Sequence, residues 1–395
     1  MKILSLHNYY KQPGGEDTAF SSELSLLRDH GHEVFEYVDN NSRVDTMHPL
    51  SVVLQTIWSM SSRKKLKNLL KQVRPQLAHF HNTFPLISPA AYYTCSEMGI
   101  PVVQSLDNPR LLCPAATFYR DGSICEDCLN KTPPWPGVVY ACYHNSRIQT
   151  AVVASMLTLH RYLKTWEKKV DIFVVATEFY RNKFIQGGLP PEKIAVKPHF
   201  VSSDPGARKT GRGDYILFVG RLSPEKGIMT LLEACKNLKD IPVKIRGSGE
   251  LTNDVKKFIK ENNLTKVELL GRLTRSELVD LAKGARFSVV PSGGYYETFG
   301  IVVIESFAVG VPVIVSNNGV LPEIVKDGQT GLHFTIGDSV DLAEKIVWLW
   351  NNPKRSEEMG RLARLEYENK YTAERNYDIL SGIYSSALQS KKLAI

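Results

Sequence analysis

The sequence predicts an α/β protein made of two doubly wound domains that face each other across a cleft. Short β-branched runs alternate with helical patterns along the whole chain, which is typical of βα units stacked on parallel sheets. Residues 202–213 carry several turn formers and no apolar period, so we expect them to link the two domains. The length of 395 residues also favours two to three domains.

Each domain is expected to contain six strands. In the first half the strand-like runs are 2–6, 33–38, 77–81, 101–106, 171–176 and 193–197. In the second half they are 215–219, 243–246, 267–270, 287–290, 313–315 and 331–334. We therefore divide the chain into a first domain at 1–202, a linker at 203–213 and a second domain at 214–372. A last helix at about 373–395 is expected to pack back on the first domain.

Composition excludes several classes of protein. With 43% hydrophobic and 23% charged residues the chain is neither largely disordered nor fibrous. Its net charge of +8 favours anionic partners such as phosphate or anionic lipid. The apolar run at 3–6 is too short for a signal peptide, and eighteen apolar residues never run together. We expect a cytoplasmic protein, with peripheral contact at the inner face of a membrane left open.

The run 220–227, Gly-Arg-Leu-Ser-Pro-Glu-Lys-Gly, follows the first strand of the second half and precedes a helical pattern. A loop in this place can hold a phosphate group between the fixed charges of Arg221 and Lys226. Taken alone the motif is weak, because a solvated turn would have the same composition.

A second motif follows the strand at 287–290. Glu297 and Glu305 stand eight positions apart, and the helix between them is expected to begin near Ile301. Its first amides could face a diphosphate, and Gly300 would permit close approach. Glu305 would lie one turn further along, where a carboxylate can accept hydrogen bonds from two ribose hydroxyls. The alternative is that both glutamates serve turns and ion pairs.

Together these motifs resemble glycosyltransferase family 4, the retaining group 1 enzymes with two Rossmann-like domains in the GT-B fold. The segment 310–314, Gly-Val-Pro-Val-Ile, stands in the family's order as well. The resemblance implies that Arg221 and Lys226 hold the diphosphate of a nucleotide sugar, Glu305 the ribose and Glu297 the donor sugar. It also implies further donor contacts at Phe299, Gly300, Ile301 and Val302, and near the base at Gly271, Arg272 and Leu273.

Catalysis is expected to require no metal ion or other cofactor. The chain contains no Asp-x-Asp motif, the usual carrier of Mg²⁺ or Mn²⁺ on a nucleotide diphosphate. Arg221, Lys226 and helix amides would neutralise the leaving group instead.

The first half also resembles the family, with one departure. Gly14 and Gly15 follow the first strand, and paired glycines there let the backbone approach the donor sugar and phosphate. The family usually has a histidine ahead of Arg-Leu-Leu-Cys-Pro, whereas this chain has Asp107 in the run 107–109, Asp-Asn-Pro. Asp107 can accept a hydroxyl bond but cannot act as neutral imidazole does, so rate or donor preference is expected to change.

Four cysteines surround this segment, namely Cys113, Cys125, Cys128 and Cys142. A Cys-x-x-Cys pair with two further thiols can close a structural zinc site. Spacings of 11 and 13 residues beside the pair are not those of a standard zinc ribbon, so free buried thiols remain the alternative.

Residues 50–74 form an apolar run followed by basic residues at helical spacing, the pattern of one basic amphipathic helix. Such a helix either lies on anionic lipid, bringing a lipid-linked acceptor to the cleft, or packs on the core with a solvated basic face. Nucleic acid is not expected as a partner, because no recognition motif accompanies the charge.

We therefore expect a glycosyltransferase, specifically a hexosyltransferase, that moves a sugar from a nucleotide diphosphate to a saccharide, lipid-linked or small-molecule acceptor. Synthesis of cell-surface polysaccharide or glycoconjugate is the expected setting. The catalytic residues implied by the resemblance are Glu297, Arg221, Lys226 and Asp107. One alternative is an epimerase or phosphorylase on the same fold, and another is a nucleotide-sugar-binding protein with weakened catalysis.

Overall fold

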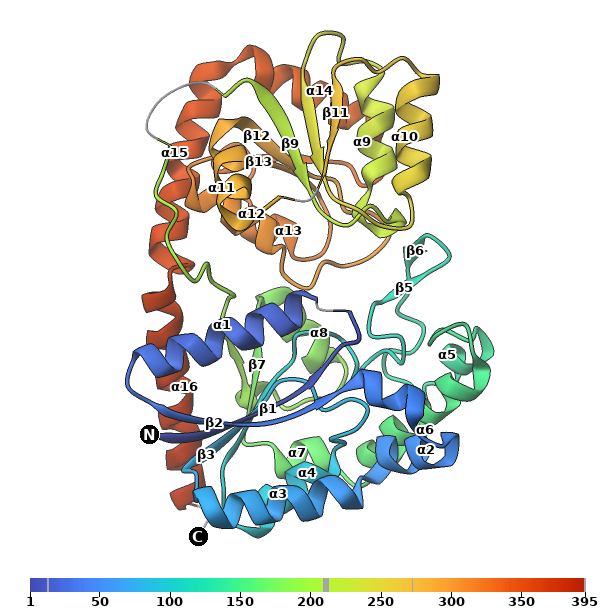
Figure 1. The fold of residues 1–395 in the computed structure, drawn as a ribbon, viewed down its shortest axis with the longest axis vertical. Helices are drawn as coiled ribbons and strands as arrows, with labels where there is room; N and C mark the ends of the chain where they lie inside the picture. Colours follow the sequence, from blue (N-terminus) through green and yellow to red (C-terminus); the bar gives the residue numbers. More distant parts are fainter. Residues whose placement is uncertain (13, 209–212, 272, 394–395) are drawn as a thin grey trace. The chain divides into compact units, whose positions relative to one another are not determined.

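The computed structural model describes residues 1–12, 14–208, 213–271 and 273–393. The chain divides into two compact units (Figure 1). The first unit consists of Met1–Phe118, Glu126–Pro198 and Asn376–Ile395, and the second of Tyr119–Cys125 and His199–Arg375. A short segment near residue 120 therefore belongs to the second unit, although the chain on both sides of it belongs to the first.

The first unit contains a six-stranded parallel sheet in the order β2-β1-β3-β4-β7-β8. All six predicted strands are present, with ends that differ by at most three residues. Their bounds are β1 Lys2–Tyr9, β2 Glu33–Asn40, β3 Leu77–Phe80, β4 Val102–Ser105, β7 Ile172–Val175 and β8 Ile194–Val196.

Helices surround this sheet. They are α1 (Gly15–Asp29), α2 (Pro49–Trp58), α3 (Met60–Val73), α4 (Ala90–Glu97), α5 (Trp135–Val139), α6 (Arg147–Tyr162), α7 (Thr165–Lys169), α8 (Glu178–Gln186) and α16 (Ala373–Leu393). The prediction of one helix over 50–74 was wrong. Ser59 has an extended conformation between α2 and α3, and its hydroxyl caps α3 by accepting a hydrogen bond from the Ser62 amide.

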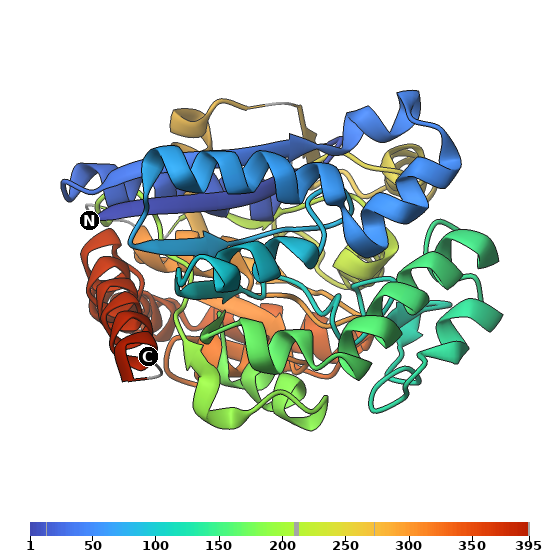
Figure 2. The same ribbon diagram turned by 90° about the horizontal axis from the view of Figure 1, so that it is seen from below.

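The core of the first unit joins distant parts of the chain. Ile3, Leu77, Val103 and Val174 lie on four neighbouring strands and pack against Leu27 of α1. The same cluster contains the α16 residues Leu380, Ile383, Tyr384 and Ala387. Figure 2 shows α16, in red, beside the N-terminus. The last helix is thus part of the first unit's hydrophobic core.

The second unit contains a six-stranded parallel sheet in the order β11-β10-β9-β12-β13-β14. All six predicted strands are again present. Their bounds are β9 Tyr215–Val219, β10 Val243–Arg246, β11 Val267–Leu270, β12 Ala285–Val290, β13 Val313–Ser316 and β14 Gly331–Phe334. The unit also contains a hairpin that was not predicted, formed by β5 (Tyr119–Arg120) and β6 (Ser123–Ile124).

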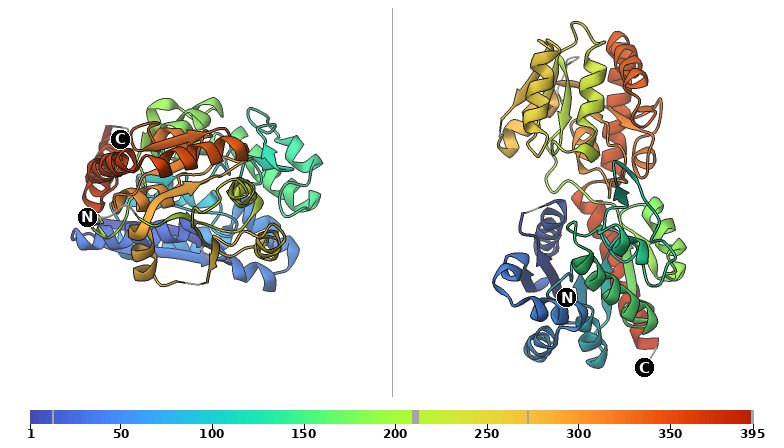
Figure 3. Two further views of the ribbon diagram at one scale, coloured as in Figure 1. Left: turned by 90° about the horizontal axis from the view of Figure 1, so that it is seen from above. Right: turned by 90° about the vertical axis from the view of Figure 1, so that its right-hand side faces the viewer.

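Helices lie on either side of this second sheet (Figure 3). They are α9 (Ile228–Cys235), α10 (Thr252–Glu261), α11 (Arg275–Gly284), α12 (Ile301–Ala308), α13 (Leu321–Ile324), α14 (Ser339–Asn351) and α15 (Pro353–Lys370). Ile216 and Phe218 pack in one cluster with α9 and α14, whereas Leu217 packs in another with α11. Alternate residues of β9 therefore face opposite layers, as in a doubly wound sheet. No helix among the described residues is both long and apolar enough to cross a membrane.

Candidate active site

In the second unit the strand order reverses between β9 and β12, which pair with each other. Ligands of open parallel sheets bind at the carboxyl ends of the strands where the order reverses. The loop at 220–227 leaves β9 at this point, and the loop at 291–300 leaves β12 beside it. The topology therefore places the two predicted motifs at one edge of the sheet.

Lys226 and Glu297 form the centre of this site. The Lys226 Nζ lies 2.6 Å from Glu297 Oε1 and donates a hydrogen bond of 2.5 Å to the Tyr295 hydroxyl. The Ser292 hydroxyl donates to the same Glu297 oxygen at 2.6 Å. Burial alone would raise the pKa of Glu297, but the charge of Lys226 and these hydrogen bonds lower it. Glu297 is therefore an ionised, buried carboxylate held in a fixed position.

Gly227 allows the two loops to meet. Its φ is +67°, and a Cβ atom on it would lie 1.8 Å from the carbonyl oxygen of Pro291. No other residue fits there without separating the loop of Lys226 from the loop of Glu297. Sequence analysis did not assign this glycine a role.

Arg221 lies apart from this ion pair. Its side chain is 67% exposed, and its guanidinium lies 3.3 Å from Glu225 Oε1. An exposed pair of this kind contributes little to stability, so the guanidinium can exchange its partner for an anionic ligand. Of the two predicted phosphate-binding cations, only Lys226 contacts Glu297 in this structure.

The helix α12 begins at Ile301, as predicted. Gly300 is its N-cap, with a φ of +92°. The first amides of an α-helix lack the usual partner four residues back, and this end carries partial positive charge. Here the Val303 amide donates to the Gly300 carbonyl at 2.9 Å, which leaves the amides of Ile301 and Val302 as the ones that could face a ligand. The donor contacts expected at Phe299, Gly300, Ile301 and Val302 stay a prediction, and they fall on the first residues of this helix, on its N-cap and on the residue before the N-cap. The Phe299 side chain is only 2% exposed and packs against His199 and Tyr371.

Glu305 lies one turn further along α12 and is exposed. With Arg275 of α11 it lines a pocket of about 60 Å³ that is open to solvent. The other walls are largely apolar and include Leu217 and Val219 of β9 and Leu278 of α11. Polar groups beside apolar walls are the lining that a nucleoside would need, because its ribose is polar and its base is flat and apolar. Arg275 was not predicted, although it begins the helix that follows the segment assigned to the base.

That segment follows β11, the edge strand of the sheet. Gly271 and Leu273 are described, whereas Arg272 lies outside the described residues. Two strands separate β11 from β12, whose loop carries Glu297.

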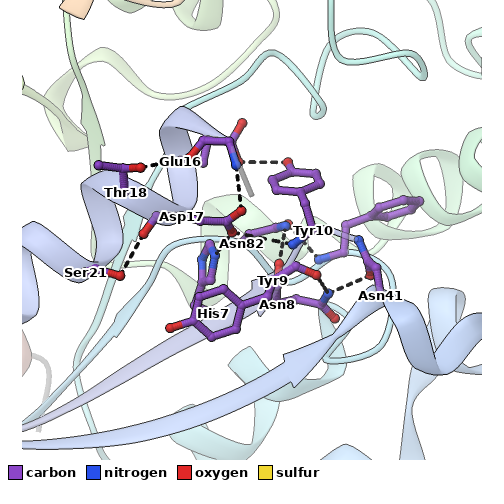
Figure 4. A network of polar contacts seen from close by, with 12 residues as sticks. His7, Asn8, Tyr9, Tyr10, Glu16, Asp17, Thr18, Ser21, Asn41 and Asn82 are labelled. Atoms are coloured by element: carbon purple, nitrogen blue, oxygen red, sulfur yellow. Dashed lines mark hydrogen bonds and ion pairs between the residues drawn. The ribbon is translucent and has the colours of Figure 1, made fainter. Parts of the chain in front are cut away.

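In the first unit the strand order reverses between β1 and β3. Gly14 and Gly15 lie here, both exposed, where the chain enters α1, whose residues Glu16 and Asp17 are labelled in Figure 4. Asp17 fixes this turn, because it accepts a hydrogen bond from the Gly14 amide at 2.9 Å and contacts His7 Nε2 at 2.7 Å. The paired glycines thus lie at the carboxyl edge of the sheet, and their contact with a donor stays a prediction.

Glu16 was missed by sequence analysis. It accepts hydrogen bonds from the Tyr10 hydroxyl at 2.8 Å and from the Asn108 amide at 2.9 Å. Burial and the nearby charge of Asp107 raise its pKa to about 7, although these bonds and Arg110 oppose the shift. Asp107 therefore stands near a second carboxyl group, a setting unlike that of a neutral histidine. The one feature of the sequence that could have indicated a role for Glu16 is its position directly after Gly14 and Gly15.

A buried polar cluster lies deeper in the first unit. Glu23 Oε1 lies 3.0 Å from His79 Nδ1 and 3.3 Å from His81 Nε2. These three groups form the one set of three potential metal ligands that the structure brings together among its described residues. Lys197 Nζ lies 2.8 Å from Glu23 Oε2, so a cation already balances the carboxylate. The cluster is therefore best understood as a buried ion pair.

The predicted zinc ligands remain a prediction. Cys113 and Cys128 are buried, and Cys125 and Cys142 are half-buried. Three of the four belong to the first unit and Cys125 to the second. The four thiols are therefore divided between the two units.

Comparison with known proteins identifies the class. Residues 204–366 match the family model described as glycosyl transferases group 1. The chain is 33% identical to the D-rhamnosyltransferase WbpZ of Pseudomonas aeruginosa over 281 residues, which cover 65% of this chain and 72% of that protein. It is 38% identical over 165 residues to the uncharacterized glycosyltransferase MJ1178 of Methanocaldococcus jannaschii, covering 41% and 46% of the two chains.

Solved structures give the same fold. The Anabaena protein Alr3699/HepE, solved in complex with UDP, superimposes with a TM-score of 0.69 at 18% identity, over 98% of this chain and 100% of that one. The fold is thus GT-B, with two parallel α/β sheets. The chain belongs to the group 1 glycosyltransferases. The alignments span about half the length of several curated relatives, including 46% of MJ1178.

Proposed function

We propose that the protein is a retaining glycosyltransferase of family 4 that uses a nucleoside diphosphate sugar. The contact between Lys226 and Glu297 carries this proposal. A cation beside an ionised carboxylate, at the point where the strand order reverses, supports a site in which Lys226 would meet the departing diphosphate and Glu297 the sugar hydroxyls. Binding of UDP by a protein of the same fold supports a nucleotide donor.

In the proposed reaction the bond between the anomeric carbon and the phosphate oxygen breaks, and its electron pair leaves with the diphosphate. The acceptor oxygen bonds to the same face of the anomeric carbon, so the configuration is kept. The acceptor proton passes to a phosphate oxygen of the leaving group. Lys226, Arg221 and the amides of Ile301 and Val302 stabilise the charge that develops there.

We also propose that the reaction needs no divalent metal. The second unit supplies positive charge from two side chains and from the N-terminus of α12. The test is sugar transfer in EDTA and in excess Mn²⁺. Equal rates are expected, whereas activity that appears only with Mn²⁺ would contradict the proposal.

In this proposal the two units bind different substrates. The second unit, with a domain at 214–372, binds the donor, and the first, with a domain at 1–202, binds the acceptor. The segment at 203–213 links the domains, and the helix at 373–395 serves the first. Names of relatives such as O-antigen chain mannosyltransferase C of Escherichia coli favour an acceptor in polysaccharide or glycoconjugate synthesis.

We further propose a cytoplasmic enzyme that contacts the inner face of a membrane. Leu50 and Leu54 of α2 are 67% and 68% exposed, and the exposed side of α3 carries Lys64, Lys65, Lys67 and Lys71. Exposed apolar groups followed by lysines suit a surface of anionic lipid. Co-sedimentation with anionic vesicles but not zwitterionic ones is expected. Binding to neither kind of vesicle would contradict the proposed membrane contact and favour a soluble acceptor.

A second candidate function is nucleotide-sugar binding with weak catalysis. It rests on Asp107, which lies near the carboxyl of Glu16 where the family has a histidine. Tight donor binding without turnover, with turnover restored by Asp107→His, would favour this candidate.

A further inference from the structure

The hairpin of β5 and β6 belongs to the second unit, yet the chain before and after it belongs to the first. Tyr119 pairs with Ile124 and Arg120 with Ser123, which leaves Asp121 and Gly122 as a two-residue turn. Both turn residues have positive φ, +51° and +81°, as a type I′ turn requires. The hairpin is therefore a locally well-defined element, and its turn is its exposed end.

This turn packs on the loop that carries Glu297. Gly294 has a φ of +76°, and a Cβ atom on it would lie 2.3 Å from the carbonyl oxygen of Gly122. The same position would lie 3.4 Å from the Tyr119 ring. Backbone thus meets backbone, and a side chain at 294 would push the hairpin away from the loop.

The hairpin also lies close to the other loop of the site. The carboxylates of Glu225 and Glu250 contribute to raising the pKa of Tyr119, after the larger effect of burial. Glu225 belongs to the loop that carries Lys226, and its carbonyl accepts a hydrogen bond of 3.0 Å from the Gly293 amide. The hairpin, the loop at 291–297 and the loop at 220–227 are therefore neighbours.

The position of this contact matters because the loop at 291–297 supplies the partners of Lys226. Ser292, Tyr295 and Glu297 all lie on it, and each bonds within the Lys226 cluster. Gly293 and Gly294 follow Ser292 directly, so this part of the backbone has no side chains of its own to hold it in place. A contact with a neighbouring element can offset the conformational entropy that the loop loses when it takes this conformation.

Resting on the proposed function, we propose that the hairpin Tyr119–Ile124 is a positioning element of the donor site, whose turn holds the loop at 291–297 so that Tyr295 and Glu297 meet Lys226. The hairpin does not act on the substrate by itself. Its effect is on the sugar and diphosphate part of the donor, whereas the pocket beside Glu305 is untouched.

Hydrogen exchange tests the contact without any need for activity. In a variant whose residues 119–124 are replaced by a short Gly-Ser linker, amides at 292–297 should exchange at least tenfold faster. Amides of β9 and β12 should be unchanged. Equal exchange at 292–297 in the two proteins would overturn the proposal.

Enzyme kinetics then test whether the contact of the hairpin with the loop at 291–297 also affects use of the donor. The linker variant should lose about tenfold in kcat/KM for the nucleotide sugar, with acceptor KM unchanged. Gly294→Ala should cause a similar loss in kcat/KM in the full chain. In the linker variant it should cause only a small further loss, because the Gly122 carbonyl that would clash with the new Cβ is no longer present. Gly382→Ala in α16 adds a Cβ that meets no atom within 4 Å, so this matched control should keep the wild-type kinetics.

The outcomes are distinguishable. Normal donor kinetics in the linker variant, or equal losses from Gly294→Ala in both backgrounds, would overturn the positioning role. A wild-type protein that binds and turns over no nucleotide sugar would count against the proposed function, and the exchange result would still decide whether the hairpin supports the loop.

Discussion

The Nζ of Lys226 lies 2.6 Å from Oε1 of Glu297, although the two residues stand 71 positions apart in sequence. The pair joins the loop after β9 to the loop after β12. It brings opposite charges of the two motifs that carry the family resemblance into direct contact.

Replacing Lys226 by alanine removes the cation and leaves Glu297 as a buried carboxylate without its charged partner. We expect kcat for sugar transfer to fall by about 10²-fold or more, since loss of one stabilising group on a developing anion typically has this effect. Lys236→Ala is the matched control, because that lysine pairs with Glu233 at an exposed position. A fall of less than about threefold for Lys226→Ala would place the reacting centre elsewhere.

Gly227→Ala should destabilise the second unit. The new Cβ would meet the Pro291 carbonyl at 1.8 Å, so the loops must separate, with a cost of about 2 kcal/mol or more. At Gly382 in α16 an added Cβ would meet no atom within 4 Å, and Gly382→Ala should leave stability equal or slightly higher. Urea unfolding of both variants measures the difference. A Gly227→Ala protein as stable as the wild type would contradict the close approach.

Lys197→Met should leave Glu23 charged and buried without its cation. Breaking a buried pair in this way costs about 3–5 kcal/mol, whereas Lys2→Met at an exposed pair should cost less than about 0.5 kcal/mol. Denaturant unfolding followed in the first unit checks both. If Lys197→Met behaved like Lys2→Met, the cluster would not be a buried ion pair, and a bound metal would be the next candidate to assay.

The raised pKa of Glu16 predicts that the stability of the folded protein depends on pH. Its pKa is raised from 4.5 to about 7 in the folded protein, so folding takes up a proton between these values. Its contribution is therefore most favourable at low pH and is lost as the pH rises from about 4.5 to about 7. Glu16→Gln should remove this loss, which is on the order of 1–3 kcal/mol. Relative to the wild type, the variant should therefore have a higher melting temperature at pH 8 than it has at pH 5. An identical change with pH in wild type and variant would show that Glu16 titrates normally.

Much of the fold could be predicted because the strands of a parallel sheet are buried on both faces and appear as short β-branched runs. All twelve sheet strands were found in this way. The hairpin was missed although Asp121-Gly122 is a strong turn signal, because its strands are only two residues long. The break at Ser59 was missed because the apolar and basic residues continue at helical spacing across it.

The site was predictable only in part. Motifs placed Lys226, Glu297 and Glu305 at the carboxyl edge of a sheet, but their pairing depends on which strands are neighbours. The encounter of Glu16 with Asp107 joins the loops after β1 and β4, 91 positions apart, and no local pattern specifies it. Arg275 and Gly294 likewise acquire their roles from elements packed against them.

The most direct test of the central claim is calorimetric titration of the protein with UDP, GDP and ADP in EDTA, using the wild type, Lys226→Ala and Glu305→Ala. The account predicts that one nucleoside diphosphate binds the wild type without metal and that each substitution weakens this binding at least tenfold. Binding that requires Mn²⁺, or that both variants retain at full affinity, would contradict it.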